Sequence, residues 1–213
     1  MTIGTPEVLR ELLDFFTPLA KVRRVLRGAA VLHAPAHPVL GANAAYVFDE
    51  QGAVRADTWY RAQGAPTVLA SASSHPDGDE VLSLRVGTFR ALPLASTIVA
   101  EQVSRLQVAI FAEVLCDAWN VPDWEEDVAR ALAAALEGRS DVTLYLAYED
   151  RPVGALLERG GRAHLWGVTN EAALLPLLNA ACELGGGEVR TSVPSEHPLA
   201  LHAAAPVVFS RLT

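Results

Sequence analysis

The stretch from Asp141 to Cys182 constrains the fold most, because strand-like and helix-like patterns alternate in it over short distances. From Thr143 to Tyr148, one set of residues alternates with a second set at every other position, as on the two faces of a strand, and the turn sequence Glu-Asp-Arg-Pro ends the run. This pattern predicts a strand that enters a β-hairpin. Strand-forming residues and glycine turns define the next two elements of the chain. The expected order is strands over 143–148, 152–158 and 163–168 and a helix over 172–184.

The helix at the end of this unit has a clear start and an apolar face. The sequence Thr-Asn-Glu at 169–171 offers side-chain caps for the unpaired amides of a helix N-terminus. Leu174, Leu177 and Leu178 recur at helical spacing, so we expect them to face the sheet. The polar residues before them should lie at the exposed start of the helix.

A resemblance to a known family rests on three consecutive pieces: the sequence LYLAYEDRPVGALLE, a strand ending in GVT, and an Ala/Leu-rich helix. Together they resemble the central part of the GNAT superfamily of acyl-CoA-dependent N-acyltransferases. The resemblance covers 95–213 and implies an α/β (α+β) fold, with a mixed, mainly antiparallel sheet flanked by helices. It also implies acetyl-CoA or another acyl-CoA as the cofactor of an active protein, and a small-molecule or protein amine as its substrate.

The turn that holds the cofactor pyrophosphate in that family is shortened here. The family has a turn of the type Gln/Arg-x-x-Gly-x-Gly/Ala, whose backbone N–H groups bind the anion together with the helix N-terminus. The positions that correspond to this cofactor site are Gly167, Val168, Thr169 and Asn170. About five residues of the turn are missing after them. Glu171 adds a negative charge where a polyphosphate would sit.

The catalytic residues of the family also have incomplete counterparts. The resemblance aligns Ala200-Leu201-His202 with the family's Ala-Leu-Tyr, whose tyrosine protonates the departing thiolate. Histidine is a common proton donor in catalysis, so His202 is the candidate general acid, although a helix-surface role is the simpler interpretation. Glu158 and Glu113 are the candidate bases. A backbone N–H near Gly167 and Val168 would polarise the thioester.

These features support two hypotheses of different class. The first is a GNAT-like protein with impaired or lost acetyl-CoA binding, which serves as a ligand-binding or dimerisation module. The second is a functional N-acetyltransferase that holds its acyl-CoA in a non-standard way. A fold persists when its chemistry is lost, so the fold alone does not decide between them.

The N-terminal part predicts a smaller, related α/β unit. It is similar to the N-terminal segment of larger GNAT proteins, which places domains at 1–94 and 95–213. The elements expected outside 141–184 are helices over 5–27, 53–63, 97–120, 123–136 and 199–205 and strands over 29–33, 44–48, 67–71, 81–89, 188–193 and 207–212. The four cations Lys21, Arg23, Arg24 and Arg27 would then lie on the solvated face and last turn of the first helix.

Composition excludes several classes of partner. A formal net charge of −8 over 213 residues argues against nucleic acid, because phosphate binding needs a dense Lys/Arg surface. No apolar run approaches the roughly twenty residues that span a bilayer, so we expect no membrane partner and a cytoplasmic location. A homodimer is possible on the same sequence evidence. The single lysine among the 17 basic residues is typical of a GC-rich, bacterial-type genome.

Two further residue types have simple interpretations. His33 and His37 have a ligand-like spacing, but intervening prolines exclude the helix that would bring them to one face, so we predict no metal site. Cys116 and Cys182 lie in apolar helical contexts, which predicts buried free thiols.

Overall fold

The computed structural model describes residues 5–213 and has the expected mixed α/β fold class. The chain divides into two units, one formed by the residues up to Gly87 together with Ser192–Thr213, and one formed by Thr88–Thr191. We call them unit 1 and unit 2 and describe each by itself. The C-terminal segment Ser192–Thr213 groups with the N-terminal residues in unit 1, and the division into domains 1–94 and 95–213 stays a prediction.

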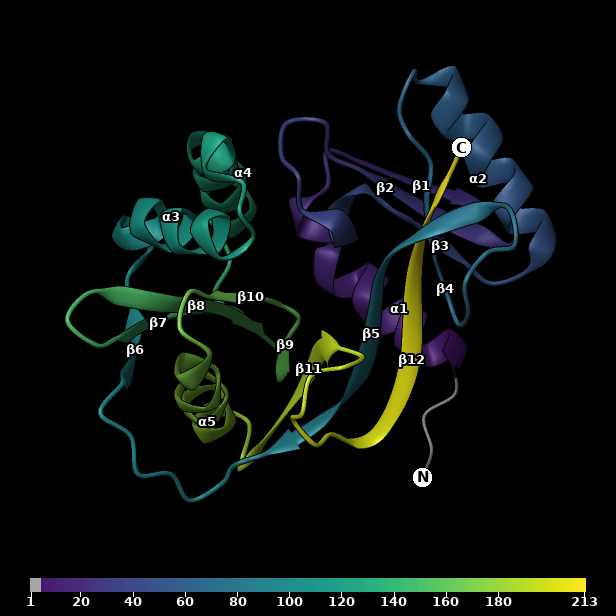
Figure 1. Cartoon of the computed structure of the whole chain (residues 1–213). Coiled ribbons are helices and arrows are strands. Elements are labelled where there is room, and N and C mark those ends of the chain that lie inside the picture. Colours follow the sequence, from purple (N-terminus) through teal and green to yellow (C-terminus); the bar gives the residue numbers. More distant parts are fainter. Residues whose placement is uncertain (1–4) are drawn as a thin grey trace. The chain divides into compact units, whose positions relative to one another are not determined.

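Unit 2 contains a four-stranded sheet between helices (Figure 1). Its strand order is β10-β8-β7-β6, and every neighbouring pair is antiparallel. Helices α3 and α4 lie on one face of the sheet and α5 lies on the other (Figure 1). The elements are β6 (Val99–Val103), α3 (Val108–Ala118), α4 (Glu125–Leu136), β7 (Val142–Tyr148), β8 (Pro152–Arg159), β9 (Arg162–Ala163), β10 (Leu165–Val168), α5 (Leu174–Leu184) and β11 (Glu188–Pro194).

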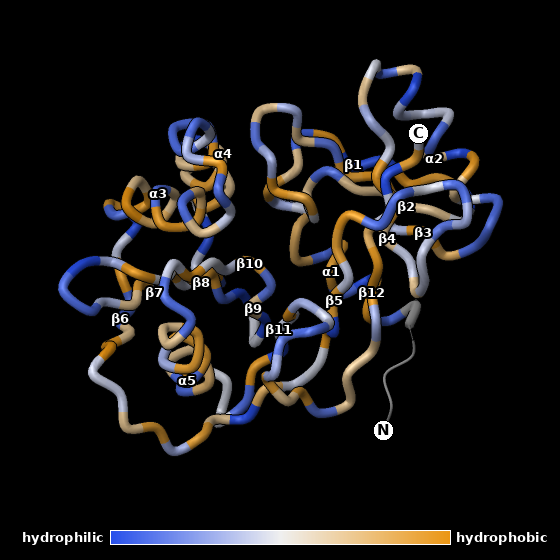
Figure 2. Tube along the Cα trace, in the orientation of Figure 1, coloured by the Kyte–Doolittle hydropathy of each residue, from blue (hydrophilic) through white to orange (hydrophobic). Residues whose placement is uncertain are grey.

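Glycines let both helical layers approach this sheet closely. A Cβ on Gly154 of β8 would lie 2.9 Å from Leu177 Cδ1 of α5. A Cβ on Gly167 of β10 would lie 2.8 Å from Ala118 Cβ of α3, on the opposite face. Apolar residues of the strands and of the helices on both faces are buried, and the segments that carry them are orange in Figure 2.

The leucine face of α5 is buried as the sequence predicts. Leu174 is 2% exposed, and Leu177 and Leu178 are fully buried. Asn170 caps the helix start with its side chain, and Glu171 after it is exposed.

Replacing Leu178 with alanine should lower the free energy of unfolding by about 2–5 kcal/mol, because a fully buried leucine leaves a cavity when truncated. Urea unfolding of the purified protein measures this change. The control is Leu184→Ala on the same helix, where the side chain is 60% exposed and the expected change is below about 0.5 kcal/mol. Equal effects at the two positions would contradict the packing.

Unit 1 has the strand order β1-β2-β3-β4-β12-β5. Its elements are α1 (Thr5–Phe16), β1 (Val22–Leu26), β2 (Ala29–His33), β3 (Ala45–Val47), α2 (Glu50–Ala62), β4 (Val68–Ser71), β5 (Gly78–Arg90), whose end passes into unit 2, and β12 (His202–Leu212). Strands β3 and β4 are parallel and the α2 crossover joins them. The sheet is therefore mixed.

Helix α2 covers one face of this sheet. Its Ala53, Ala56 and Tyr60 pack with Val31 of β2 and Leu69 of β4 in one buried cluster. Alternate residues of β2 are also buried and point to the other face, where α1 contacts β2, β3 and β12. The sheet thus has apolar layers on both sides.

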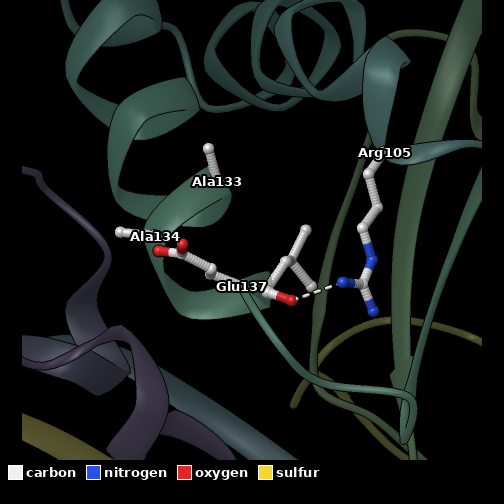
Figure 3. Close-up of a pocket in the computed structure, with 5 residues that line it drawn as sticks. Arg105, Ala133, Ala134 and Glu137 are labelled. Carbon is white, nitrogen blue, oxygen red and sulfur yellow. Dashed lines mark hydrogen bonds between the residues drawn. The ribbon is translucent and has the colours of Figure 1, made fainter.

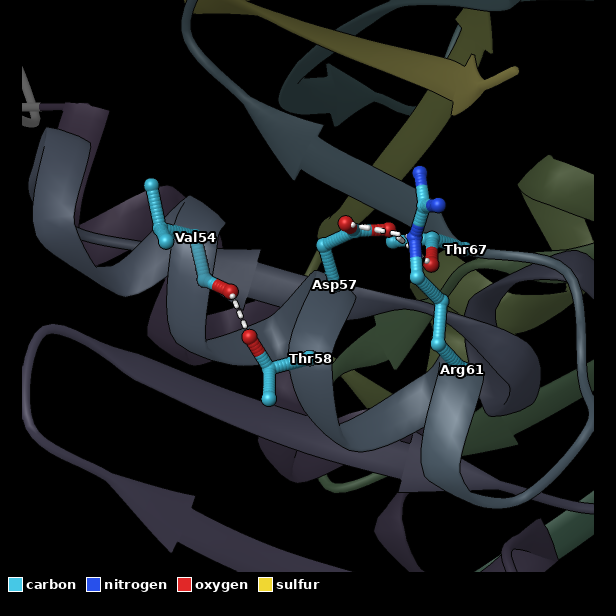
Figure 4. Close-up of polar contacts among 5 residues, drawn as sticks. All are labelled: Val54, Asp57, Thr58, Arg61 and Thr67. Carbon is cyan, nitrogen blue, oxygen red and sulfur yellow. Dashed lines mark hydrogen bonds and ion pairs between the residues drawn. The ribbon is translucent and has the colours of Figure 1, made fainter.

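Polar contacts fasten α2 to the strand that comes after it (Figure 4). The Asp57 carboxylate accepts hydrogen bonds from Thr67 Oγ1 and from Arg61 Nε, each at 2.8 Å. Because Thr67 directly precedes β4, its bond to Asp57 connects α2 to the end of the crossover, whereas the Arg61 bond lies within α2 and orients the carboxylate.

Two expected helices are shorter than predicted. The first ends at Phe16 instead of Arg27, because Pro18 lies in a 3₁₀ turn and the chain is extended at Ala20. The four cations after it therefore belong to an edge strand and its turn and not to a helix. The helix expected over 97–120 begins only at Val108, since 99–103 forms β6 against β7.

The helix expected over 199–205 does not form. Ala203 adopts a positive φ of 49°, a left-handed conformation that a right-handed helix cannot include, and His202 begins β12. The segment before it is tied to β5 by Arg85, whose Nε donates to Ser195 O at 3.1 Å and whose Nη2 donates to the carbonyls of His197 and Leu199. These carbonyls point to a side chain and not along a helix axis.

Replacing Arg85 with lysine should destabilise this segment by about 1–3 kcal/mol, because one ammonium group cannot reach three carbonyls that a guanidinium fork serves. Hydrogen exchange should become faster at 195–201 in this variant. Arg211→Lys, at an exposed position of β12, is the control and should leave that exchange unchanged. Equal exchange in the two variants would contradict the role of Arg85.

Candidate functional site

The third strand of the GNAT-like segment is interrupted at His164. Before it, β9 pairs in parallel with β11, with Ala163 opposite Thr191. After it, β10 pairs with β8, with Leu165 opposite Leu157. The chain therefore changes neighbours at one residue, and β10 ends as an edge of the four-stranded sheet.

The backbone of Val168 faces this open edge. Thr169 N donates to Val153 O at 2.9 Å, so this pair is hydrogen-bonded across the ladder. Hydrogen-bonded and non-hydrogen-bonded pairs alternate in an antiparallel ladder. Val168, opposite Gly154, is therefore non-hydrogen-bonded, and its N–H points away from β8.

The connection from β10 to α5 uses its own polar groups. Asn170 Oδ1 accepts a hydrogen bond from Ala172 N at 3.0 Å, and Asn170 O accepts one from Ala173 N at 2.9 Å. Leu174 N donates to Glu171 O. Three successive amides at the helix start thus have partners within the turn.

Negative charge surrounds the same helix start. Glu171 is exposed in its first turn, and Asn170 Nδ2 donates to Glu149 Oε2 at 3.3 Å. Across Thr88–Thr191, fifteen Asp and Glu residues face eight arginines and no lysine, a formal net charge of −7. Negative charge near a helix start disfavours a polyphosphate at that place.

The four expected cofactor-site residues lie together at the end of β10 and the start of the turn. Gly167 is buried, Val168 and Asn170 are half-buried, and Thr169 is exposed. The sequence did not identify the break at His164, because the run from Ala163 to Val168 has strand-forming composition throughout. The one feature of the sequence that marks the position of the break is the histidine, a polar residue in an otherwise apolar run.

The three candidate catalytic residues lie on three different elements, two in unit 2 and one in unit 1. Glu158 is four residues along β8 from Gly154, the partner of Val168, which places it about 13 Å away along the strand. Glu113 is exposed on α3. His202 is exposed at the start of β12 in unit 1.

Glu158 has a structural role at the end of β8. Its Oε1 accepts a hydrogen bond from Gly161 N at 2.5 Å, across a turn in which Gly160 and Gly161 have positive φ angles. The side chain is 6% exposed and lies opposite Thr143 of β7. Burial raises the pKa of this carboxyl above its ordinary value. The hydrogen bonds from Gly161 and Thr143 lower the pKa, but by less than burial raises it.

Stability should therefore depend on the protonation of Glu158. Because the folded-state pKa is raised, the folded protein binds the proton more tightly than the unfolded chain, and stability falls as pH rises above about 4.5 through the folded pKa. Glu158→Gln should remove this part of the pH dependence in urea unfolding between acidic and neutral pH. The control is Glu126→Gln at an exposed position of α4; identical pH slopes in wild type and Glu158→Gln would contradict the assignment.

A shallow pocket of about 310 Å³ lies elsewhere in unit 2, at the C-terminal end of α4 (Figure 3). Arg105 and Glu137 contribute its charged groups, and the rest of its lining is Ala133, Ala134 and Leu136. Arg105 Nη1 donates to Leu136 O at 2.6 Å, which places positive charge at the negative end of the helix dipole. The guanidinium is thus already engaged as a helix cap.

His33 and His37 each contact other residues of unit 1. His37 is buried, with Nε2 2.8 Å from Leu19 O and Nδ1 accepting from Val39 N, whereas His33 packs against the rings of Trp59 and Tyr60. No group of three His, Cys, Asp or Glu side chains in the described part of the chain could hold a metal ion.

Both cysteines are free and buried, as predicted, and burial raises the pKa of each thiol to about 11.

Within residues 5–213, no helix is long and apolar enough to cross a membrane.

Comparison with known proteins identifies the fold through structure and not through sequence. No protein-family model matches the sequence, and no curated protein matches it either. Among solved structures, a GCN5-related N-acetyltransferase from Sphaerobacter thermophilus aligns with a TM-score of 0.51 and 17% identity over 86% of this chain and 76% of its own. A tandem GNAT protein from the clavulanic acid biosynthesis pathway aligns with a TM-score of 0.51 and 12% identity over 86% and 77% of the two chains.

This chain has a GNAT-like fold. A functionally unknown conserved protein from Staphylococcus epidermidis has the same architecture, with a TM-score of 0.58, 11% identity, and coverage of 89% of this chain and 93% of its own. Apart from β6 and the short β9, the order α3-α4-β7-β8-β10-α5-β11 in unit 2 is the order that the GNAT resemblance of the sequence implies. Identities this low show the fold, and function must be argued from the residues of the site.

Proposed function

We propose that this chain is a GNAT-like, acetyltransferase-related protein in which acetyl-CoA binding is impaired or lost. The observation that supports it is the connection between β10 and α5, where Asn170 and Glu171 accept hydrogen bonds from three successive amides. A pyrophosphate at this helix start would have to displace those bonds. Pro176, inside the first turns of α5, supplies no N–H.

The size of the effect follows from the number of missing donors. A hydrogen bond to a charged group contributes about 1.5–3 kcal/mol, so the loss of two or three of them weakens binding about a hundredfold or more. The carboxylates of Glu149 and Glu171 and the net charge of −7 in unit 2 act in the same direction. Geometry and electrostatics both disfavour a polyphosphate at this place.

The proposal leaves a binding role for the fold. The outward backbone of Val168 at the edge of β10 can pair with a small-molecule ligand or an amine-containing segment, whereas Trp166 O on the same edge already accepts from Trp119 Nε1 at 3.2 Å; this pairing requires no acyl transfer. A homodimer formed through such an edge is compatible with the same role.

Acetyl-CoA should bind no tighter than about 1 mM in isothermal titration calorimetry, with a correspondingly small rise in thermal stability. Glu171→Arg should not restore binding, because one side chain cannot replace backbone donors. Glu171→Gln is the matched control that removes the charge without adding a cation. Micromolar binding with chemical-shift changes at 168–174 would refute the proposal and favour a functional N-acyltransferase.

A further inference from the structure

The first strand of unit 1 is an edge with an unusual concentration of positive charge. β1 ends the strand order of its sheet and pairs with β2 alone among the described strands. Lys21, Arg23, Arg24 and Arg27 lie on it or beside it, and all four are exposed. Residues 15–48 contain no Asp or Glu. In the part of the chain that the structure describes, none of the four cations forms an ion pair.

The backbone of this strand presents hydrogen-bonding groups at the open edge. Leu32 N donates to Ala44 O at 3.0 Å, so the Leu32 amide points away from β1. Its register partner is Arg23, which makes this pair non-hydrogen-bonded and turns the N–H and C=O of Arg23 away from β2. Alternation gives Val25, opposite Ala30, the same outward orientation.

Side chains on both faces of the edge add to this surface. Arg23 and Val25 lie on one face of the strand and Arg24 lies on the other, because successive side chains alternate. Val25 is 74% exposed, although it is β-branched and apolar. Arg55 of α2 lies close by, with Nη1 donating to Arg27 O at 2.9 Å.

The charges decide which kind of strand can pair here. A second copy of β1 in antiparallel register would bring its arginines against those of the first, and like charges opposite one another are destabilising. A basic or neutral segment gains nothing from the four unpaired cations. An extended segment with Asp or Glu side chains on both faces gains cross-strand ion pairs in addition to the backbone bonds.

We propose that β1 is a docking edge for an extended acidic peptide segment, which adds to the sheet as a further strand. The backbone N–H and C=O groups of Arg23 and Val25 bind the main chain of the peptide, and Arg23, Arg24 and the flanking cations select its acidic side chains. The edge lies in unit 1 and does not depend on acyl-CoA binding in unit 2.

The test uses the full chain and a fluorescein-labelled peptide of about eight residues, in which two Glu residues and two Val residues follow one another in turn. Fluorescence anisotropy should show binding that weakens as salt increases. A peptide of equal length with Lys in place of Glu should not bind. Hydrogen exchange should slow at the Arg23 and Val25 amides when the acidic peptide is bound, and this protection distinguishes strand addition from loose charge attraction.

Two variants separate the backbone from the charges. Val25→Pro removes one outward N–H without removing a β1–β2 hydrogen bond, and it should weaken binding about tenfold; Val25→Thr keeps the amide and is its control. The double substitution Arg23→Glu and Arg24→Glu should also weaken binding about tenfold or more and should favour the Lys peptide. This charge reversal does not alter the backbone and remains informative if the proline variant fails to fold.

Three outcomes would overturn the proposal. Equal binding of the acidic and basic peptides would remove the selectivity. Acidic-peptide binding without protection of the β1 amides would make the surface a diffuse anion attractor. Tighter binding of single-stranded DNA or of anionic lipid vesicles than of the acidic peptide, with no loss in Val25→Pro, would assign the cations to a different partner.

Discussion

The cap that Asn170 makes at the start of α5 is the interaction on which the functional interpretation of this structure depends. Its side chain and its carbonyl accept the first amides of the helix, so the chain passes from strand to helix with two residues between β10 and the first helical turn. A helix N-terminus has only a few unpaired N–H groups, and a turn that uses them internally cannot offer the same groups to an anion. Local stability and phosphate binding therefore compete for the same donors.

Unit 2 could be predicted largely from its sequence because its local patterns and its packing agree. The alternation over 143–148, the turn at Glu149–Pro152 and the leucines of α5 each specify an element, and the buried faces of those elements meet in one sheet with helices on both sides. The open edge of β10 was less predictable. It depends on the change of partner at His164, and strand composition carries no information about which neighbour a strand pairs with.

Three helix predictions differ from the structure, and in each the local sequence pattern is overridden by contacts with residues elsewhere in the chain. The predicted helices include the cations after Pro18 and residues 97–103. Both stretches contain β-branched residues, which suit strands, and pairing with β2 or β7 stabilises the extended chain there. The segment over 199–205 has the composition of a helix. Ala203 in this segment is left-handed, and Arg85, which lies far away in the sequence, binds Leu199 O at its start, an effect that no local periodicity reports. The exposed position of His202 on a strand results from this, and so could not be predicted from its neighbours.

Charge is distributed unequally along the chain, and this distribution bears on both proposed sites. Unit 2 has a net charge of −7, whereas the cations of residues 15–48 have no acidic residue among them. Exposed charges contribute little to folding stability, so the sequence can change them without loss of the apolar layers that hold the sheets. The apolar cores hold the GNAT-like fold, while polar groups at a strand edge and at a helix start form the two proposed sites. A fold whose anion-binding amides are capped can in this way retain its architecture and present its recognition groups on an edge strand instead.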